Sequence, residues 1–404
     1  MPIANSIPHQ IVNDVPGTIR IDGEVEKTVT LDDDVFTGSL VAGYLNFEKM
    51  TNPNTLPPST GNGCSITSDG CYVAVAFLGM PNVMIYKRNG DKFNKLNNPN
   101  ILPSGSGRSC AFSQSGIYLV VGINSDPFIT IYKRNGDVFT KLNDPFLLPS
   151  GAGVGCAFSF DDNYLAITHG ATPFITIYKR SGDVFTKLNN PDILPSANNA
   201  YSCSFSRDGN YLAVAHDRTA FITIYKRNGD EFTKLNNPDV LPPGGARGCS
   251  FSPDSNYLAI AHFTTPFITI YKRNGDVFTK LDNPDILPPS NGYSCSFSRD
   301  GRYLAVGHGT TPFITIYKRS GDVFTKLNNP DILPTGTANG CSFALSNDYL
   351  AVGHAVTPYI TIYRYMKNLG ISNKIDQSLS AEYIGYAIED GEVEQEIPIM
   401  TVLH

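Results

Sequence analysis

A cysteine recurs through most of the 404-residue chain at intervals of 46, 46, 47, 46, 46 and 46 residues. The seven positions are Cys64, Cys110, Cys156, Cys203, Cys249, Cys295 and Cys341. A tyrosine keeps the same spacing, mostly inside the sequence I-Y-K-R, at Tyr86, Tyr132, Tyr178, Tyr225, Tyr271, Tyr317 and Tyr363. A fixed period of this length is the signature of a solenoid, a propeller or an array. The chain therefore contains one structural unit copied seven times, and this repeat overrides a domain count based on length.

Each copy has the pattern of four short β-strands separated by turns. In residues 249–281, CSFS alternates apolar and polar residues, S-P-D-S-N forms a turn, and Tyr257 to His262 is an apolar strand. Phe267 to Lys272 alternates around two isoleucines. Asn274-Gly275 then predicts a two-residue hairpin turn of type I′, which needs positive φ at both positions. Val277 to Leu281 completes the hairpin, and a stretch rich in Pro, Asn and Gly leads to the next copy.

Seven copies of four antiparallel strands predict an all-β fold, a seven-bladed β-propeller. The repeat has no 3.6-residue periodicity, which excludes an α-solenoid. The last copy ends at residues 360–364 without a hairpin partner, whereas residues 45–53 match the fourth strand of the other copies. We therefore expect the two ends of the repeat to share one blade, because such closure leaves no exposed sheet edge. The residues expected to close this blade are Phe47, Met50, Ile360 and Ile362.

The distribution of charge divides the chain into three segments. Residues 1–44 and residues 366–404 each carry a net charge of −5, which leaves the propeller segment, residues 45–365, with +4. This balance is too weak to indicate nucleic acid, which requires a concentrated basic stripe. The acidic end segments contain alternating stretches, so we expect them to pair as a small β-module that anchors the propeller. The stretches are Gly17 to Asp22, Lys27 to Leu31, Tyr383 to Ile388 and Ile397 to Leu403.

Cysteine usage and apolar runs exclude several classes of protein. Eight cysteines in 404 residues fall below the density of a disulfide scaffold, and no C-x-x-C pair indicates a metal site. We expect the seven repeat cysteines to be buried and reduced, and Cys71 in a turn to be exposed. The apolar runs are strand-sized, which predicts no membrane insertion, and the N-terminus lacks the pattern of a Sec signal peptide.

Several sequence blocks resemble known proteins. The block S-x-D-G-x-Y-L-A-V followed by I-x-I-Y resembles the WD40 repeat, although Tyr-Lys or Tyr-Arg replaces Trp-Asp and the chain has no Trp. The unit P-F-I-T-I-Y-K-R-N-G-D-V-F-T-K-L-N-N-P resembles propeller repeats in tail and baseplate-associated proteins of bacteriophages and their prophage relatives. The C-terminal stretch A-E-Y-I-G-Y-A-I-E-D-G-E-V-E-Q-E-I-P-I resembles the ending of small β-rich phage decoration or fibre-type proteins. These resemblances imply a virion or phage-like particle protein, assembled in the cytoplasm of a bacterial host.

A histidine ends the second strand of five copies and is the candidate for a ligand-binding or partner-binding face. These residues are His169, His216, His262, His308 and His354, while the first two copies carry Phe77 and Ile123. Because His titrates near neutral pH, such a ring would bind an anion or sense pH. The alternative is an imidazole hydrogen-bonded to its own neighbouring loop. A shared metal ion is not expected, because successive blades lie too far apart for ligation at ~2.0–2.1 Å.

Two further patterns have a functional and a structural interpretation. A Lys-Arg pair precedes each hairpin and an Asp follows it, as in Lys272, Arg273 and Asp276. These residues form either a basic ring that docks an acidic partner or a solvated rim with weak cross-strand ion pairs. The loop residues Asp192, Asp239, Asp285 and Asp331 suggest calcium. Because calcium needs six to eight converging oxygens, a turn that tucks its Ile-Leu pair against the blade is the better interpretation.

Near-identical copies argue against catalysis, which needs unlike groups in different roles. We predict a non-enzymatic structural or interaction protein of a phage or phage-like particle, without cofactor or metal. We expect multiple copies per particle, attached to other particle proteins through residues 1–44 and 366–404. The alternative is a multivalent lectin-type adhesin with equivalent interblade pockets for host surface glycan. A cytosolic scaffold and a propeller enzyme are the remaining classes, and unlike channel-facing carboxylates would indicate the enzyme.

Overall fold

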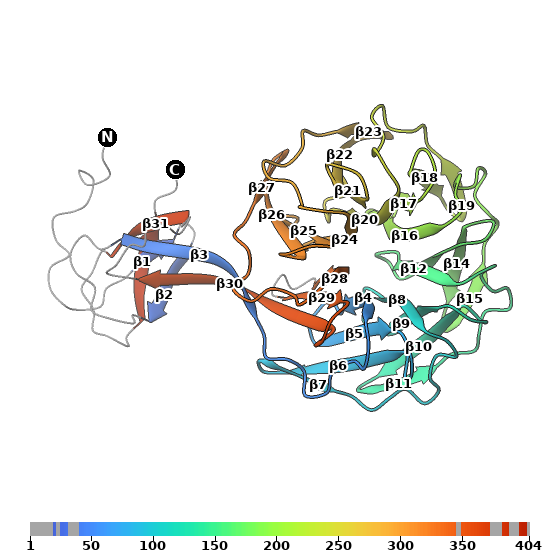
Figure 1. Cartoon of the computed structure of the whole chain (residues 1–404), viewed down its shortest axis with the longest axis horizontal. Coiled ribbons are helices and arrows are strands. Elements are labelled where there is room, and N and C mark those ends of the chain that lie inside the picture. The colour runs from blue at the N-terminus through green and yellow to red at the C-terminus, as the bar shows by residue number, and fades with distance from the viewer. Residues whose placement is uncertain are drawn as a thin grey trace. The chain divides into compact units, whose positions relative to one another are not determined.

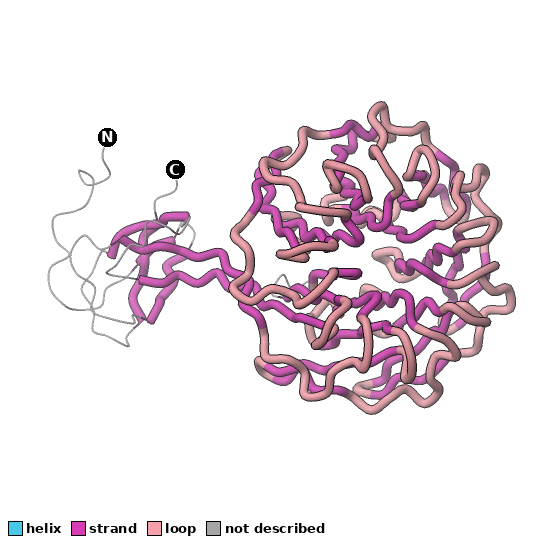
Figure 2. Tube along the Cα trace, in the orientation of Figure 1, coloured by secondary structure: helices cyan, strands magenta, loops and turns pink. Residues whose placement is uncertain are grey.

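The computed structural model describes residues 47–344 and 349–365 in full, and the backbone of six further strand segments. Those segments are residues 19–21, 25–30, 40–46, 366–371, 382–387 and 396–401. The chain forms two compact units, Lys49–Arg364 and the combination of Met1–Glu48 with Tyr365–His404. All regular structure in the described residues is β-strand (Figure 2). No described segment forms a helix long and apolar enough to cross a membrane.

Seven antiparallel sheets are arranged as blades around a central axis, which confirms the predicted fold class of a seven-bladed β-propeller (Figure 1). The innermost strands of blades 1 to 7 are β4 (Gly61–Ile66), β8 (Gly107–Phe112), β12 (Gly153–Phe158), β16 (Ala200–Phe205), β20 (Ala246–Phe251), β24 (Gly292–Phe297) and β28 (Ala338–Phe343). The second strands are β5 (Tyr72–Phe77), β9 (Tyr118–Ile123), β13 (Tyr164–His169), β17 (Tyr211–His216), β21 (Tyr257–His262), β25 (Tyr303–His308) and β29 (Tyr349–His354). The third strands are β6 (Val83–Asn89), β10 (Ile129–Asn135), β14 (Ile175–Ser181), β18 (Ile222–Asn228), β22 (Ile268–Asn274), β26 (Ile314–Ser320) and β30 (Ile360–Ile371). The outer strands are β7 (Lys92–Lys95), β11 (Val138–Lys141), β15 (Val184–Lys187), β19 (Glu231–Lys234), β23 (Val277–Lys280), β27 (Val323–Lys326) and, in blade 7, β3 (Leu40–Lys49).

The hydrophobic core lies between neighbouring blades. Every residue of β21 is buried, because alternate side chains of this strand pack against the blades on its two sides. Tyr257 packs with residues of blade 6, and Leu258 packs with residues of blade 4. A strand buried on both faces is apolar at nearly every position. In the outer strand β23 only Phe278 is buried, so that strand keeps the alternating pattern of a half-exposed sheet edge.

The hairpin between the third and outer strands lies one residue beyond its predicted position. Asn274 is the last residue of β22 and pairs with Val277, so the two-residue loop is Gly275-Asp276. Of these two loop residues only Gly275 has positive φ, at 58°, as a type II′ turn with Gly first requires. The predicted type I′ turn at Asn274-Gly275 is therefore wrong, and the shift places Asp276 at the tip of the hairpin.

A tyrosine at the start of the second strand ties each of five blades to the next, in an arrangement that we call the interblade clamp. Tyr211 donates its hydroxyl hydrogen to Asp276 of the next blade at 2.6 Å, and Lys226 binds the same carboxylate at 2.7 Å. The ring of Tyr211 packs edge-on against Phe278, with centroids 6.0 Å apart, and lies 4.6 Å from the guanidinium carbon of Arg273. The hydrogen bonds from Lys226 and then Tyr211 lower the pKa of the Asp276 carboxyl, so the clamp is ionised at neutral pH.

The interblade clamp accounts for the repeated Lys-Arg and Asp residues. Its Tyr–Asp pairs are Tyr72–Asp137, Tyr118–Asp183, Tyr164–Asp230, Tyr211–Asp276 and Tyr257–Asp322. The Lys and Asp side chains form half-exposed ion pairs, as the interpretation of a solvated rim predicts, but each Asp at a hairpin tip pairs with the Lys of the preceding blade. The junction of blades 7 and 1 differs. There Arg364 binds Asp91 at 2.6 Å, and Arg88 donates to the hydroxyl of Tyr349 at 3.1 Å.

Blade 7 takes its outer strand from the opposite end of the repeat, as predicted. Strand β3 lies beside β30, and the Met50 amide donates to the carbonyl of Ile362 at 2.8 Å. Phe47, Met50, Ile360 and Ile362 are all buried.

The end segments of the chain contribute four more strands, which overlap the predicted stretches. These strands are β1 (Ile19–Ile21), β2 (Val25–Thr30), β31 (Glu382–Ala387) and β32 (Glu396–Thr401). Strand β32 pairs in parallel with β1 and in antiparallel orientation with β2 and β31. Segments from both ends of the chain therefore share one sheet. The rest of the predicted tail stretches lies outside the described residues.

All eight cysteines are free thiols, and six of the seven repeat cysteines are buried. Cys156 is partly exposed, which differs from the prediction, and its Sγ lies 3.1 Å from the hydroxyl of Ser109, a polar group of the neighbouring blade. Cys71 is partly exposed in its turn. Burial raises the pKa of the Cys249 thiol to about 12.

Alkylation of the native protein should begin at Cys71. The thiolate is the reactive species, and a buried thiol with a pKa of about 12, such as Cys249, supplies very little of it. Brief treatment with iodoacetamide followed by peptide mass spectrometry measures the order of labelling. The protein unfolded in urea is the control, because all eight cysteines should then react alike. Labelling of Cys249 before Cys71 in the native protein would contradict the prediction.

Variants of Tyr211 should separate the packing and hydrogen-bonding parts of the clamp. Tyr211→Phe loses one hydrogen bond to a carboxylate and should lower the free energy of unfolding by about 1–2 kcal/mol. Tyr211→Ala also loses a buried ring and should cost about 3–5 kcal/mol. Lys226→Met removes an exposed ion-pair partner and should cost the least of the three variants, because water and salt screen such a pair. Urea unfolding measures all three, and an equal loss for Tyr211→Ala and Lys226→Met would show that ring packing does not hold the blades together.

Candidate functional site

At one position of the repeat the residue type differs from blade to blade, although the residues on both sides of it are small in every blade. It is the second residue of the innermost strand, preceded by Gly or Ala and followed by Gly or Ser and then Cys. The seven residues are Asn62, Arg108, Val154, Tyr201, Arg247, Tyr293 and Asn339. The neighbours are small because the blades approach closely here, and a Cβ on Gly248 would lie 2.8 Å from the Cα of Ser294. The seven blades therefore bring unlike side chains together on one small ring.

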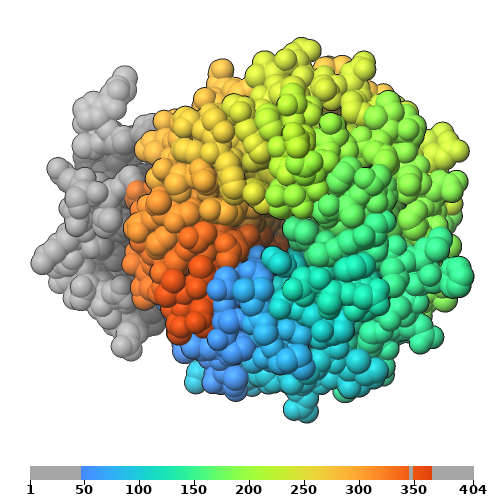
Figure 3. Space-filling model, turned by 45° about the vertical axis from the view of Figure 1, so that its right-hand side comes forward, coloured from blue at the N-terminus to red at the C-terminus, as the bar shows by residue number. Residues whose placement is uncertain are grey.

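These seven side chains surround a cavity of about 180 Å³ at the N-terminal ends of the innermost strands, which we call the arginine–tyrosine mouth. The space-filling view shows a hollow at the centre of the ring of blades (Figure 3). Two arginines give the cavity wall a formal charge of +2, and none of the described residues that line it is acidic. Asparagine amides and tyrosine hydroxyls add neutral hydrogen-bonding groups. This set of side chains suits the binding of a small polar or anionic group.

Arg247 is the most constrained side chain of the arginine–tyrosine mouth. Its guanidinium carbon lies 3.6 Å from the ring centroid of Tyr201 and 4.5 Å from that of Phe263. The ring of Phe263 in turn packs edge-on against Tyr293, with centroids 5.1 Å apart. Blades 4, 5 and 6 thus contribute one cluster of three aromatic rings and one cation.

The opposite end of the channel has a second cavity, also of about 180 Å³, which we call the phenylalanine mouth. Its lining includes the phenylalanines that end β8, β12, β16, β20 and β24, at Phe112, Phe158, Phe205, Phe251 and Phe297. Their rings also pack into the cores between the blades. Arg207 lies 4.4 Å from the ring centroid of Phe160, and Arg299 also lines this cavity. The phenylalanine mouth therefore has the same charge as the other mouth but fewer neutral polar groups.

The five predicted histidines lie inside the blades. Each imidazole is at most 1% exposed, and its Nε2 is 2.9–3.0 Å from the hydroxyl of a threonine seven residues later, on the adjacent third strand. In blade 5, for example, His262 bonds to Thr269. Burial lowers the pKa of all five imidazoles to about 4. The assignment of these histidines to a ligand-binding face stays a prediction, and a ligand would first have to uncover them.

Blade 1 shows what replaces the His–Thr pair. Phe77 stands at the His position, and Met84 stands at the Thr position. Both are buried, so an apolar pair occupies the place of the hydrogen-bonded pair. In blade 1 both members of the pair change together, whereas in blade 2 Ile123 replaces the histidine and the threonine, Thr130, remains. An apolar side chain therefore fills the histidine position in both blades, which favours a packing role for the histidines.

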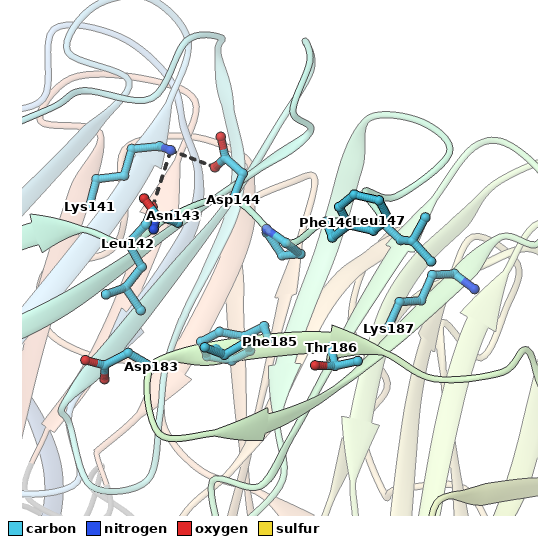
Figure 4. Close-up of a pocket in the computed structure, with 12 residues that line it drawn as sticks. Lys141, Leu142, Asn143, Asp144, Phe146, Leu147, Asp183, Phe185, Thr186 and Lys187 are labelled. Atoms are coloured by element: carbon cyan, nitrogen blue, oxygen red, sulfur yellow. Dashed lines mark hydrogen bonds and ion pairs between the residues drawn. The ribbon is translucent and has the colours of Figure 1, made fainter.

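A further hollow, of about 620 Å³, lies on the outer wall between blades 2 and 3 (Figure 4). Phe146 and Leu147 of the connecting loop face Phe185 of β15 across it. Phe146 is 97% exposed and stands where the next loop has Asp192, which accepts a hydrogen bond from the Lys234 amide at 2.8 Å. A phenyl ring cannot make this bond. The hollow is therefore a local departure from the repeat, on the perimeter of the ring.

Two of the four loop carboxylates cap outer strands. Asp285 accepts a hydrogen bond from the backbone amide of Lys326 at 2.9 Å, just as Asp192 does from Lys234. Each cap joins a loop to the outer strand of the next blade. Among the described residues, no group of three or more His, Cys, Asp or Glu side chains is arranged to hold a metal ion.

Reasoning from the sequence missed the arginine–tyrosine mouth. The recurring residues suggested other sites, whereas the side chains that surround this cavity come from a position at which the copies differ. The signal was present as a variable residue between two small residues in all seven copies.

Comparisons with known proteins show the fold and no family. No protein-family model and no curated protein matches the sequence. Among solved structures, the hydrazine synthase of Kuenenia stuttgartiensis is similar over 78% of this chain and 98% of the matched chain. Its TM-score is 0.61 and its sequence identity is 13%, so the likeness concerns the fold alone.

Acid should destabilise the propeller through its buried histidines. A pKa lowered from about 6.5 to about 4 means that the unfolded chain binds protons that the folded chain does not. The contribution of the histidines to the free energy of unfolding is therefore fully present above about pH 6.5 and is lost as the pH drops toward 4. At pH 5 the loss should be roughly 1–2 kcal/mol for each histidine. Thermal unfolding from pH 7 to pH 5 measures this loss.

The Phe77–Met84 pair of blade 1 shows which two substitutions can replace a His–Thr pair in another blade. His262→Phe combined with Thr269→Met should fold and should show roughly one-fifth less acid destabilisation, because one of five buried imidazoles is gone. A Tm that depends on pH as strongly as in the unsubstituted protein would contradict a role for His262 in this sensitivity.

Proposed function

We propose that this protein is a non-enzymatic recognition protein of a phage or phage-like particle. In this proposal the propeller binds a ligand at the arginine–tyrosine mouth. Residues 1–44 and 366–404 attach it to other particle proteins in several copies, during assembly in the cytoplasm of a bacterial host. The observation that supports the recognition role is the convergence of seven side chains of four different kinds, one from each blade, on a single cavity.

The attachment role is supported by the end segments. Strands from both ends of the chain pair with one another through β32, so they form a unit distinct from the propeller. The particle itself is suggested by the resemblance of the repeat to propeller repeats of phage tail and baseplate-associated proteins.

The lectin-type alternative is compatible with recognition by the propeller and attachment by the end segments. Unlike residues at one mouth favour one site per propeller over seven equivalent interblade pockets. Several copies on one particle would then supply the multivalency that raises a weak single-site affinity for host surface glycan.

Truncation separates attachment from recognition. A chain of residues 41–368 should fold as a propeller, because Lys49–Arg364 is compact by itself, but should be missing from purified particles. Circular dichroism measures folding, and immunoblotting of particles purified from the producing cells measures incorporation. The full chain with Arg108→Gln and Arg247→Gln is the control and should be incorporated normally. Incorporation of the truncated chain at the level of the full chain would refute attachment through the end segments.

A further inference from the structure

Arg247 has the properties of a preorganised anion receptor. Its guanidinium lies between the rings of Tyr201 and Phe263, which restricts its rotamers before any ligand arrives. No carboxylate lies within ion-pair distance of it among the described residues. A planar guanidinium presents a fixed fork of N–H donors that matches the two oxygens of a carboxylate. The stacking thus leaves a rigid cation that has no carboxylate partner in the described part of the propeller.

The rest of the arginine–tyrosine mouth adds a second cation and neutral polar groups. Arg108 lines the same cavity. The side-chain amides of Asn62 and Asn339 donate to the carbonyls of Gly107 and Gly61, at 2.8 and 3.2 Å. These bonds hold both amides in place and leave their side-chain oxygens as acceptors. Acceptors that line the same cavity as two cations suit a ligand that carries hydroxyl groups as well as a negative charge.

An acidic residue nearby does not neutralise this charge. The carboxylate of Asp217, next to His216 at the end of β17, accepts hydrogen bonds from the backbone amides of Asn198 and Asn199 at 2.9 and 3.1 Å. Those bonds, against the opposing effect of burial, keep the pKa of Asp217 below its usual range. The carboxylate is therefore ionised and already satisfied by its own loop.

We propose that the arginine–tyrosine mouth binds a sugar ring that carries one carboxylate, of the kind found at the ends of acidic glycans. Arg247 binds the carboxylate, Arg108 adds long-range attraction, and the Asn and Tyr side chains bind the sugar hydroxyls. The inference rests on the proposed role of the propeller as the recognition unit and adds the chemical class of its ligand.

The size and enclosure of the cavity favour one sugar over an acidic peptide. Its volume of about 180 Å³ lies below the roughly 300–1,000 Å³ of sites for drug-sized ligands. All seven innermost strands line it, so it is closed on every side around the channel axis. Extended peptides are bound along a sheet edge or an open groove, which a closed ring does not provide.

The test uses the full-length protein with sodium D-glucuronate as the probe. D-glucose is the neutral comparison, sodium acetate is the comparison without a sugar ring, and a tetraglutamate peptide represents an acidic protein. Isothermal titration calorimetry and saturation-transfer NMR measure binding. We expect glucuronate to bind at least about tenfold more tightly than glucose or acetate, because the charge-assisted pair and the hydroxyl contacts both contribute.

Arginine variants locate the binding. Arg247→Gln should weaken glucuronate binding at least about tenfold, and Arg247→Lys should weaken it less, because Lys keeps the charge without the fork. Arg207→Gln is the matched control, because Arg207 also lies over an aromatic ring but at the phenylalanine mouth. It should change the affinity less than about twofold. Thermal unfolding of each variant verifies that it is folded.

Four results would overturn the inference. Equal binding of glucose and glucuronate would make the mouth a neutral-glycan site, and binding of tetraglutamate alone would indicate an acidic protein partner. No binding of glucuronate, or equal weakening by Arg207→Gln and Arg247→Gln, would remove the acidic-sugar site altogether. None of these results affects incorporation of the protein into particles, so attachment through the end segments is tested separately.

Discussion

The propeller depends on contacts that each blade makes with its neighbours, because no blade buries its own second strand. Both faces of that strand are apolar and each needs a different blade to cover it. The interblade clamp supplies the polar counterpart of this apolar contact. Tyr211, Lys226 and Asp276 connect two blades through one carboxylate, and the tyrosine ring continues into the aromatic core beside Phe278. Since the Lys–Asp pairs are half-exposed, the buried rings rather than the ions supply most of the stability at these junctions.

The sequence predicts the blades well because every rule involved is local. The period predicts the number of blades, and the alternation of apolar and polar residues predicts the strands. The last copy lacks a fourth strand and residues 45–50 match one, which predicts that they close blade 7. The hairpin shows where local rules fail. Asn-Gly favours a type I′ turn, but a one-residue shift places Gly275 first in a type II′ turn and lets Asp276 reach the preceding blade. The local sequence allows both the type I′ and the type II′ turn, and the type II′ turn is the one in which Asp276 contacts Tyr211 of the preceding blade.

The candidate site was less predictable than the fold. Repetition drew the interpretation to the histidines, which recur and titrate near neutral pH. Their partners are threonines on the adjacent strand, and the Phe77–Met84 pair of blade 1 occupies the same place without a polar atom. Residues at the arginine–tyrosine mouth come from strands far apart in sequence, and only closure of the ring makes them neighbours. Contacts such as that of Arg247 with Tyr201 require the spatial arrangement of blades 4 and 5.

Closure of blade 7 has a mechanical consequence. The propeller begins at Lys49 and ends at Arg364, on neighbouring strands joined by the bond from Met50 to Ile362. A load that pulls both ends in the same direction enters one blade through two adjacent strands and acts on that sheet in shear, so many hydrogen bonds resist it together. The ladder between β29 and β30, from Gly353–Ile360 to Tyr349–Arg364, lies in this path. A ring tethered in this way can bear tension while the shape of its channel stays unchanged.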